Sequence, residues 1–435
     1  MLMSNEADVK QAAKTGLTPK LRFPEFRDGP GWQERQLGPM TKKVGSGITP
    51  TGGDKHYKAK GRPFVRSQNI GWGQLILDDV AFIDEEVHSS FDSTEIEVSD
   101  VLLNITGASI GRSAIADSRI VGGNVNQHVC IIRVKPSELN PVVLNQYLNS
   151  HYGQKQIESF QAGGNRQGLN FAQIRTFSIL LPPPGQEGLS EQKRIAECLI
   201  TLDEVIAAQT QKLDALKTHK KGLMQQLFPR EGETQPRLRF PEFQDAEEWD
   251  EEKLGNMVEI CSGNSPSKYA LATSGAYAFV KVEDLNNCTK YQTYSREYCD
   301  DSGDVVPRGV ILFPKRGASI ELNKIRITAS EILIDTNLMA LSPAEKVTVE
   351  FLFYFLVNVG LAQIADLSTI PQINNKHIIP FKILLPSKLE QERIADCLTS
   401  FDDLIAAQGD KLEALKTHKK GLMQQLFPSP AEFEA

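Results

Sequence analysis

The chain has 435 residues, of which 40% are hydrophobic, and a formal net charge of −7. This length suits two or three globular domains, and the longest apolar run, near residues 351–361, is much shorter than the roughly 18 residues of a membrane span. The N-terminus lacks the basic-then-apolar layout of a secretory signal, and the six cysteines form no C-x-x-C pair. We therefore expect a cytoplasmic protein with reduced thiols and no zinc site.

In chain order, we expect a flexible tail over residues 1–19 and then a first variable domain over residues 20–186. Short β-like runs at residues 101–105 and 129–134 precede a helical stretch at residues 141–160. Strands that alternate with helices predict a mixed α/β domain.

A long helix is predicted next, over residues 187–229. Its apolar positions follow an unbroken 4,3,4,3 spacing, which is typical of a coiled-coil seam, and two polar residues, Gln209 and Lys220, interrupt the seam. Ser190 is expected to cap the start of this helix, and Pro229 to end it.

A second variable domain is predicted over residues 230–386, followed by a second long helix over residues 387–428 and a tail over residues 429–435. β-like runs at residues 310–314 and 332–334 and a helical stretch at residues 349–365 again indicate a mixed α/β domain. Ser387 and Glu390 predict a capping box at the start of the second helix.

The two halves of the chain repeat each other. Residues 192–229 recur at residues 391–428 with 28 of 38 positions identical, and LRFPEF, then Trp, then Leu-Gly, stands at residues 21–38 and again at residues 238–255. Four shorter parallels link the variable domains: GITPT at 47–51 with GNSPS at 263–267, FVR at 64–66 with FVK at 279–281, GASI at 107–110 and 317–320, and NFAQIRTFSILLP at 170–182 with NNKHIIPFKILLP at 374–386. We infer that the two domains share one fold and differ in surface chemistry.

The matched seams predict that the two helices pair with each other. A parallel pair in register would place Lys220 opposite Lys419 inside the seam, where two like charges are costly. An antiparallel pair separates them and sets the acidic first half of each helix beside the basic second half of the other. We therefore predict two similar α/β domains separated by an antiparallel coiled coil with pseudo-twofold symmetry, in which Gln209 and Gln408 help to fix the register. The alternative is that each helix only covers its own domain.

Most of the negative charge lies in the two connecting segments. Residues 39–182 hold 14 Lys and Arg against 13 Asp and Glu (+1), and residues 256–386 hold 12 against 13 (−1). Residues 183–255 hold 10 against 15 (−5), and residues 387–435 hold 6 against 9 (−3). The variable domains are therefore nearly neutral and can present a basic face, while the connectors are suited to protein partners.

Polar, Gly-rich segments of both variable domains carry residues that suit nucleic acid. Lys and Arg match phosphates and guanine edges, and Asn and Gln match adenine edges, although any single one of them can equally be a solvated loop residue. In the first domain the candidate DNA-binding residues are Lys55, Lys58, Lys60, Arg62, Arg66, Gln68, Asn69, Asn126, Gln127, Arg166 and Gln167. In the second they are Lys268, Lys281, Lys315, Arg316, Asn323, Lys324, Gln372, Asn374, Asn375 and Lys376.

Several catalytic patterns are absent from the sequence. There is no G-x-x-x-x-G-K-[ST] phosphate loop, no dinucleotide or methyl-donor Gly-rich turn after a convincing strand, no Asn/Asp-Pro-Pro-aromatic motif, and no histidine spacing of a metal site. We therefore assign no catalytic residue and no metal ligand.

The repeated segments resemble the specificity subunit of type I restriction-modification enzymes. The resemblance covers residues 20–428 and rests on the two LRFPEF segments, the ILLP-to-helix junctions, the Q-[KE]-R-I-A-[ED]-C-L helix starts and the L-x-A-L-K-x-x-K-K-G-L-M-Q-Q-L-F helix ends. It implies a non-catalytic subunit whose two target-recognition domains each read one half of a bipartite double-stranded DNA site. The repeated helices would set the spacer and dock two modification subunits, which carry S-adenosylmethionine, and restriction subunits with ATP and Mg²⁺ would join them.

Two alternatives remain from the residues alone. One is a non-catalytic coiled-coil assembly protein that does not read DNA, and the other is an autonomous modification enzyme. Copurification with a methyltransferase subunit together with specific DNA retention separates the first alternative from a specificity subunit, and methyl transfer by the isolated chain would favour the second.

Overall fold

The computed structural model describes residues 16–50, 52–161, 168–368 and 370–428. The chain forms two compact units: unit 1 comprises Met1–Ala208 with Leu412–Ala435, and unit 2 comprises Gln209–Lys411. Each unit therefore contains one variable domain and parts of both repeated helices. Of the predicted tails, residues 1–15 and 429–435 lie outside the described residues, and Leu17 pairs with Trp32 through two backbone hydrogen bonds of 3.1 and 2.8 Å.

The variable domain of unit 1, residues 33–181, is called module 1 below. It contains a four-stranded sheet in the order β2-β8-β5-β6, a three-stranded sheet in the order β4-β3-β7, and the antiparallel pair β1-β9. Its strands are β1 (Gln33–Gln36), β2 (Thr41–Ser46), β3 (Arg62–Val65), β4 (Ala81–Ile83), β5 (Val101–Asn104), β6 (Ser113–Ile115), β7 (Asn124–Val125), β8 (Val129–Val134) and β9 (Ser178–Leu181). The strands predicted at residues 101–105 and 129–134 are confirmed as β5 and β8, and β5 is buried on both faces, which explains its continuous apolar run.

The helical stretch predicted at residues 141–160 is two helices. α3 (Pro141–Asn149) ends before Ser150, whose extended backbone (ψ 164°) stops it, and α4 (His151–Ser159) begins directly afterwards. The Ser150 hydroxyl accepts a hydrogen bond from the Gly153 backbone N–H (3.3 Å) and so caps α4. The other helices of this module are α2 (Glu85–Ser89) and α5 (Phe171–Arg175).

The variable domain of unit 2, residues 250–385, is called module 2. Its sheets have the orders β11-β18-β15-β16-β13, β14-β12-β17 and β10-β19. Its strands are β10 (Asp250–Lys253), β11 (Val258–Ser262), β12 (Tyr277–Val280), β13 (Tyr291–Gln292), β14 (Glu297–Cys299), β15 (Ile311–Pro314), β16 (Arg326–Thr328), β17 (Ile332–Ile334), β18 (Leu338–Pro343) and β19 (Lys382–Leu385), and its helices are α7 (Leu254–Met257), α8 (Val349–Val359), α9 (Leu361–Ile364) and α10 (Asn375–Ile378). The strands predicted at residues 310–314 and 332–334 are confirmed as β15 and β17.

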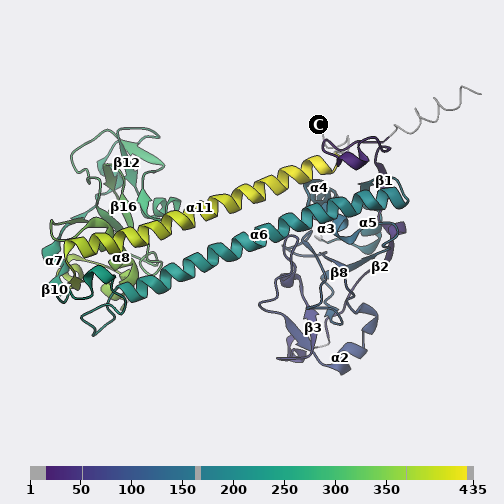
Figure 1. The fold of residues 1–435 in the computed structure, drawn as a ribbon, viewed down its shortest axis with the longest axis horizontal. Coiled ribbons are helices and arrows are strands. Elements are labelled where there is room, and N and C mark those ends of the chain that lie inside the picture. Colours follow the sequence, from purple (N-terminus) through teal and green to yellow (C-terminus); the bar gives the residue numbers. More distant parts are fainter. Residues whose placement is uncertain (1–15, 51, 162–167, 369, 429–435) are drawn as a thin grey trace, which may run out of the picture. The chain divides into compact units, whose positions relative to one another are not determined.

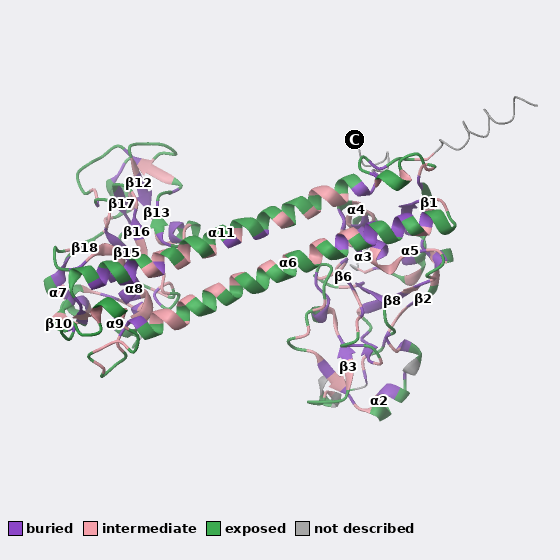
Figure 2. Cartoon of the chain, viewed as in Figure 1, coloured by how far each residue is buried: buried purple, intermediate pink, exposed green. Residues whose placement is uncertain are grey.

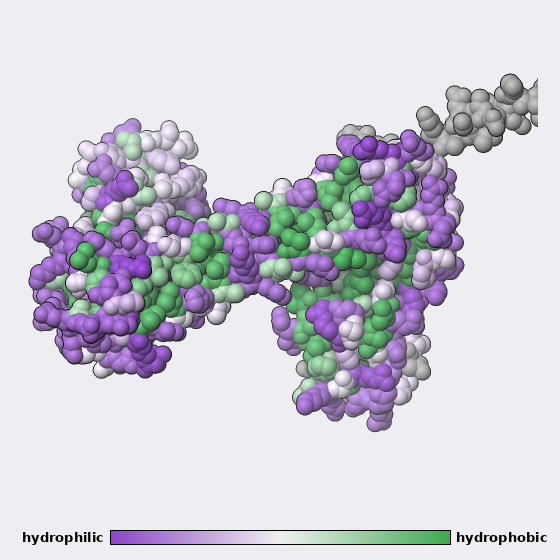
Figure 3. All heavy atoms as spheres, in the orientation of Figure 1, coloured by the Kyte–Doolittle hydropathy of each residue, from purple (hydrophilic) through white to green (hydrophobic). Residues whose placement is uncertain are grey.

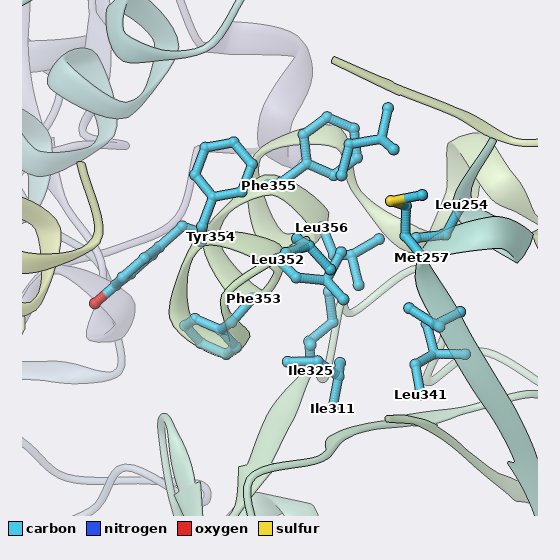
Figure 4. Packing of buried hydrophobic residues seen from close by; sticks show 14 of the residues in the cluster. Leu254, Met257, Ile311, Ile325, Leu341, Leu352, Phe353, Tyr354, Phe355 and Leu356 are labelled. Atoms are coloured by element: carbon cyan, nitrogen blue, oxygen red, sulfur yellow. The ribbon is translucent and has the colours of Figure 1, made fainter. Parts of the chain in front are cut away.

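The helical stretch predicted at residues 349–365 is also interrupted, at Gly360, where φ is +86° and favours glycine. The preceding helix, α8, forms much of the core of unit 2 and packs against β15 and β16. In Figure 4 the side chains of Leu352 and Leu356 lie beside those of Ile311 and Ile325, whereas the hydroxyl of Tyr354 points away from this apolar cluster. One helix therefore contributes both to the core and to a polar contact on another side.

The two long helices are α6 (Gln186–Leu227) and α11 (Lys388–Leu426), which Figure 1 shows as unbroken. α6 begins four residues before the predicted cap, so Ser190 lies inside the helix and its hydroxyl donates to the Gln186 carbonyl (2.9 Å). The predicted Ser190 cap is therefore wrong. Both helices end before Pro229 and Pro428, as expected.

The start of one long helix and the end of the other lie in the same hydrophobic core. In unit 1, Ile195 and Leu199 of α6 are buried together with Leu426 of α11. In unit 2, Ile394 and Leu398 of α11 are buried together with Leu227 of α6. Figure 2 shows buried residues near the start of each long helix and largely exposed middle stretches. The two helices thus run antiparallel within each unit, and neither of them covers only its own domain.

Ion pairs inside the seam follow the same antiparallel arrangement. In unit 1 the Lys419 ammonium donates to the Asp203 carboxylate (2.6 Å). In unit 2 Lys220 pairs with Asp402, whose other oxygen accepts from the Tyr354 hydroxyl (2.6 Å). The two lysines that interrupt the seam are therefore each neutralised by an aspartate of the other helix.

The glutamines that interrupt the seam also meet. Gln408 is buried and its side-chain amide donates to the side-chain oxygen of Gln209, both within unit 2. A polar pair inside an apolar seam can be satisfied only in one register. This contact supports the prediction that Gln209 and Gln408 fix the register.

The repeated LRFPEF…W segment holds the start of each long helix. In unit 1 the buried guanidinium of Arg22 makes two hydrogen bonds of 2.7 Å to the carboxylate of Glu191, and the Trp32 indole N–H adds a third of 3.2 Å. Leu21 also donates its backbone N–H to the Gln425 carbonyl (3.0 Å), so this segment joins the start of α6 to the end of α11.

Unit 2 repeats this arrangement, with Arg239 bound to Glu390 through two hydrogen bonds of 2.8 Å and Trp249 at 3.4 Å from the same carboxylate. The backbone N–H of Leu238 donates to the Gln226 carbonyl (3.0 Å). The predicted capping box is only half formed, because Ser387 accepts from the Glu390 backbone N–H (3.3 Å) while the Glu390 side chain binds Arg239 instead.

Candidate nucleic-acid interface

Several strands and loops of module 1 end at one polar edge. The backbone N–H of Asn126 donates to the carbonyl of Val65 at the end of β3 (3.0 Å), and that of Ile105 donates to the His128 carbonyl (3.0 Å). The side-chain amide of Asn104 at the end of β5 donates to the Ser67 carbonyl (2.8 Å). These bonds bring together the segments that follow β3, β5 and β7, and we call the surface they form the strand-end edge of module 1.

A chain of polar side chains crosses this edge. The Thr106 hydroxyl lies 2.6 Å from Nδ1 of His128, whose Nε2 lies 3.0 Å from the Gln127 side-chain nitrogen. The Gln127 side-chain oxygen accepts from the Thr49 hydroxyl. Gln127 is exposed, so the chain is positioned by its internal bonds and still presents polar atoms to a ligand.

Module 2 has a strand-end edge built on the same backbone bonds. The N–H of Asp335 donates to the carbonyl of Val280 at the end of β12 (3.0 Å), and the N–H of Lys315 donates to the Asn337 carbonyl (2.8 Å). Asn264 forms a β-bridge with Asp335, so the segment before η7 (Pro266–Lys268) joins this edge as well. The parallel motifs of the sequence thus mark equivalent positions in the two modules.

The turn that follows β3 and β12 is another shared feature. The Asn69 side-chain oxygen accepts from the Arg66 backbone N–H (2.9 Å), as the Asp284 carboxylate accepts from the Lys281 N–H (2.9 Å). The Asn69 amide also donates to the carbonyls of Ile76 (2.9 Å) and Asp79 (3.0 Å), and the residue is 1% exposed. Asn69 therefore builds the turn, and its amide is not available to a base.

Three of the predicted cations of module 1 form ion pairs on its surface. Arg62 pairs with Glu85 (2.7 Å), Arg66 with Asp79 (3.4 Å) and Lys58 with Asp84 (3.7 Å). Figure 1 places β3 and α2 at the end of this module away from α6, and Figure 3 shows hydrophilic residues there. Exposed pairs of this kind are weak, so these cations can exchange a carboxylate for a phosphate.

The remaining predicted residues of module 1 are scattered. Gln68 is exposed and its side-chain amide donates to Asp79 (2.7 Å). Lys55, in η3 (Gly53–His56), and Lys60 are exposed. Asn126 is 7% exposed and its side-chain oxygen accepts from the His128 backbone N–H (3.1 Å), so it supports the strand-end edge from beneath. The predicted residues Arg166 and Gln167 lie outside the described residues.

Two predicted cations of module 2 are paired with carboxylates. Lys268 donates to Asp304, and this hydrogen bond lowers the pKa of the Asp304 carboxyl and raises the pKa of Lys268. Lys281 pairs with Glu297 beside the turn after β12. At neutral pH the Lys268–Asp304 pair is therefore fully charged, and its net charge is zero.

Lys315 and Arg316 stand next to each other at the end of β15. Burial, and then the charge of Arg316, lower the pKa of Lys315, while Arg316 itself is exposed. Arg316 forms a β-bridge with Gln372, and the side-chain oxygen of Gln372 accepts from the Asn374 amide (3.4 Å). Lys315, Arg316, Gln372 and Asn374, which are far apart in the sequence, therefore lie together at the strand-end edge.

The other predicted residues of module 2 have different positions. Asn323 supports the core, since its amide donates to the Val357 carbonyl (3.0 Å) and its oxygen accepts from the Leu361 N–H (2.9 Å). Lys324 is half-buried in the neighbouring turn. Asn375 and Lys376 are exposed on α10, which follows the strand-end edge.

Sequence reasoning missed Thr106, His128 and Asn337 at the two edges. The candidate DNA-binding residues were chosen among Lys, Arg, Asn and Gln, so Thr and His were not considered. Thr106 nevertheless directly precedes one of the parallel motifs. The equivalence of the motifs between the domains was the signal that could have identified these positions.

Comparison with known proteins places the chain in a family. The family model described as "Type I restriction modification DNA specificity domain" matches residues 30–218 and 246–417. The chain belongs to this family. The Putative type I restriction enzyme MjaX specificity subunit of Methanocaldococcus jannaschii is 25% identical over 409 residues, covering 91% of this chain and 92% of the relative. The MjaVIII specificity subunit of the same organism is 25% identical over 353 residues, which cover 76% and 79%.

Solved structures of similar proteins share the fold of this specificity subunit. The type I restriction-modification S subunit of M. genitalium has a TM-score of 0.57 with 15% identity and covers 95% of this chain and 100% of its own. A chain from a study of complex assembly and conformational transition of the type I R-M system has a TM-score of 0.58 with 20% identity, covering 92% and 98%. In the part of the chain that the structure describes, no helix is long and apolar enough to cross a membrane.

Proposed function

We propose that this specificity subunit recognises a bipartite double-stranded DNA site, with one half contacted by the strand-end edge of each module. The observation that carries the proposal is that the two edges share their backbone hydrogen bonds and differ in their side chains. Thr106 and His128 stand in module 1 where Arg316 and Asn337 stand in module 2. Base edges are distinguished by their patterns of hydrogen-bond donors and acceptors. Two domains with the same backbone arrangement but different polar side chains can therefore recognise different DNA sequences.

We propose further that the repeated helices dock two modification subunits. The helix ends carry the same sequence, LKTHKKGLMQQLFP, in both copies, and Val205 and Leu404 occupy the same repeat position and expose 39% and 55% of their surface. Equivalent exposed apolar positions suit two copies of one partner. In this proposal S-adenosylmethionine binds to the modification subunits, ATP and Mg²⁺ bind to restriction subunits, and this chain carries out no chemistry. No observation favours an assembly protein without DNA reading.

Exchanging one module tests the proposal. Residues 256–386 are replaced by the module of another family member, the chain is expressed with its modification subunit, and methylated sites are mapped by long-read sequencing. One half of the methylated site should change and the other should stay the same. The matched control exchanges residues 39–182 and should change the opposite half. Altered methylation of both halves after a single exchange would contradict modular reading.

A further inference from the structure

The two strand-end edges place different side chains on one backbone frame. Leu169 donates its N–H to the Ile105 carbonyl (2.8 Å), and Ile373 donates in the same way to Lys315 (2.9 Å). The next residue forms a β-bridge in each module, Thr106 with Gly168 and Arg316 with Gln372. The position that carries a short hydroxyl in module 1 therefore carries a guanidinium in module 2.

Arg316 is exposed and not engaged by an acid. Among the described residues it forms no ion pair, whereas Lys268 and Lys281 of the same module are bound to Asp304 and Glu297. Asp335 of the same edge directs one carboxylate oxygen at the backbone and side-chain N–H groups of Asn337 (2.7 and 2.9 Å). The guanidinium thus keeps its donors for a ligand.

The backbone that carries Arg316 is held rigidly. Gly317 adopts φ +80° and donates its N–H to the Pro371 carbonyl (2.9 Å), and Lys315 is fixed on both sides by the bonds described above. An arginine on a fixed backbone loses less conformational freedom on binding than one on a loose loop. A contact with a base edge requires hydrogen bonds of defined direction, whereas a contact with a phosphate requires mainly a positive charge. A rigidly positioned arginine is therefore better suited to a base edge.

We propose that Arg316 determines the specificity of module 2 by binding a guanine in the second half-site. This inference rests on the proposed function above. Two parallel N–H donors of a guanidinium match O6 and N7 of guanine in the major groove, and no other base presents this pair of acceptors. Thr106, at the same place in module 1, has one hydroxyl and cannot make this contact, so the two half-sites differ at the corresponding base pair.

The experiment compares Arg316→Thr, which installs the side chain of module 1, with Arg316→Lys, which keeps the charge and removes the two-donor fork. Each full-length variant is expressed with its modification subunit, and methylated sites are mapped. Arg316→Thr should lower the preference for guanine at one position of the second half-site roughly 10- to 100-fold. Arg316→Lys should lower it less. The first half-site and the spacer should stay unchanged. Arg308→Thr, which removes an exposed cation before the opposite end of β15, is the control and should leave the sequence preference unaltered.

Each other outcome overturns the inference in a distinct way. A second half-site without guanine on either strand contradicts it before any mutation. Weaker methylation of all sites with an unchanged sequence preference would show that Arg316 binds a phosphate, and unchanged methylation would show that it does not contact DNA. In both cases the proposed function stands. A change in both half-sites would instead contradict the assignment of one module to each half.

Discussion

At the scale of single residues, the buried pair of Arg22 and Glu191 has the clearest energetic consequence. Replacing Glu191 with alanine leaves the guanidinium buried among groups that cannot replace both of its hydrogen bonds. We expect the free energy of unfolding to fall by about 3–5 kcal/mol, as for other buried ion pairs that lose one partner. Urea unfolding of the purified chain, followed by circular dichroism, measures this loss.

The exposed pair Arg119–Asp117 provides the control for this prediction. Its atoms lie 2.7 Å apart, as close as those of the buried pair, but both side chains are largely in water. Asp117→Ala should therefore cost no more than about 1 kcal/mol. Equal losses in the two variants would show that burial does not govern the strength of the Arg22–Glu191 pair.

These residues also show where prediction from sequence stops. Glu191 and Glu390 have the spacing of ordinary exposed helix residues, and their partners Arg22 and Arg239 lie 169 and 151 residues away in the chain. Asn69 was predicted to contact DNA because its amide suits adenine, yet its bonds to nearby carbonyls use that amide within the turn. Composition indicates which groups a residue carries, but tertiary contacts determine which of them remain free.

At the scale of elements, the apolar pattern and the prolines of the sequence predicted the strands and helix ends that local interactions determine. β5, β8, β15 and β17 followed from apolar runs, and the ends of α6 and α11 followed from proline. The interruptions at Ser150 and Gly360 were missed because the apolar pattern continues across both, and only the backbone angle shows that the helix stops. The Ser190 cap was predicted wrongly, because Ser190 resembles a cap in sequence while its hydroxyl donates to the Gln186 carbonyl within the helix.

The antiparallel seam within unit 1 predicts coupling between Lys419 and Asp203. Lys419→Glu alone places two carboxylates together and should destabilise the unit, whereas adding Asp203→Lys restores an opposite pair. Gln146, whose amide donates to Asp203 (3.0 Å), can turn its oxygen toward the new lysine. A double-mutant cycle on urea unfolding should give a coupling of about 1–2 kcal/mol. Additive effects would contradict direct pairing, and Lys420→Glu, at an exposed position of the same helix, serves as the control for charge alone.

At the scale of the whole molecule, the chain places a different reading surface on each of two like units and joins them through two shared helices. The pairing of the halves could be predicted from sequence because the seam residues repeat in order with their charges. The strand-end edges could not, because each is assembled from loops that the sequence separates by tens of residues. The short motifs that the two variable domains share were the only indication in the sequence that these loops occupy equivalent positions.

The shared helices lead to a prediction about the spacer of the DNA site. Seven residues inserted after Ala208 in α6 and seven after Lys411 in α11 add about 10 Å to each helix and keep the apolar seam in phase. We expect the unspecified spacer of the methylated site to lengthen by roughly 3 base pairs, at about 3.4 Å per step, with both half-sites unchanged. Long-read methylation mapping gives the spacer directly.

A second, four-residue insertion distinguishes the effect of helix length from the effect of the heptad register of the seam. Four residues added at the same two points lengthen each helix by about 6 Å but turn the seam out of register, because the apolar spacing repeats every seven residues. That variant should lose site-specific methylation, whereas the seven-residue variant keeps it with a longer spacer. A spacer of unaltered length in the seven-residue variant would mean that the helices do not measure the distance between half-sites, and that the modification subunits set it.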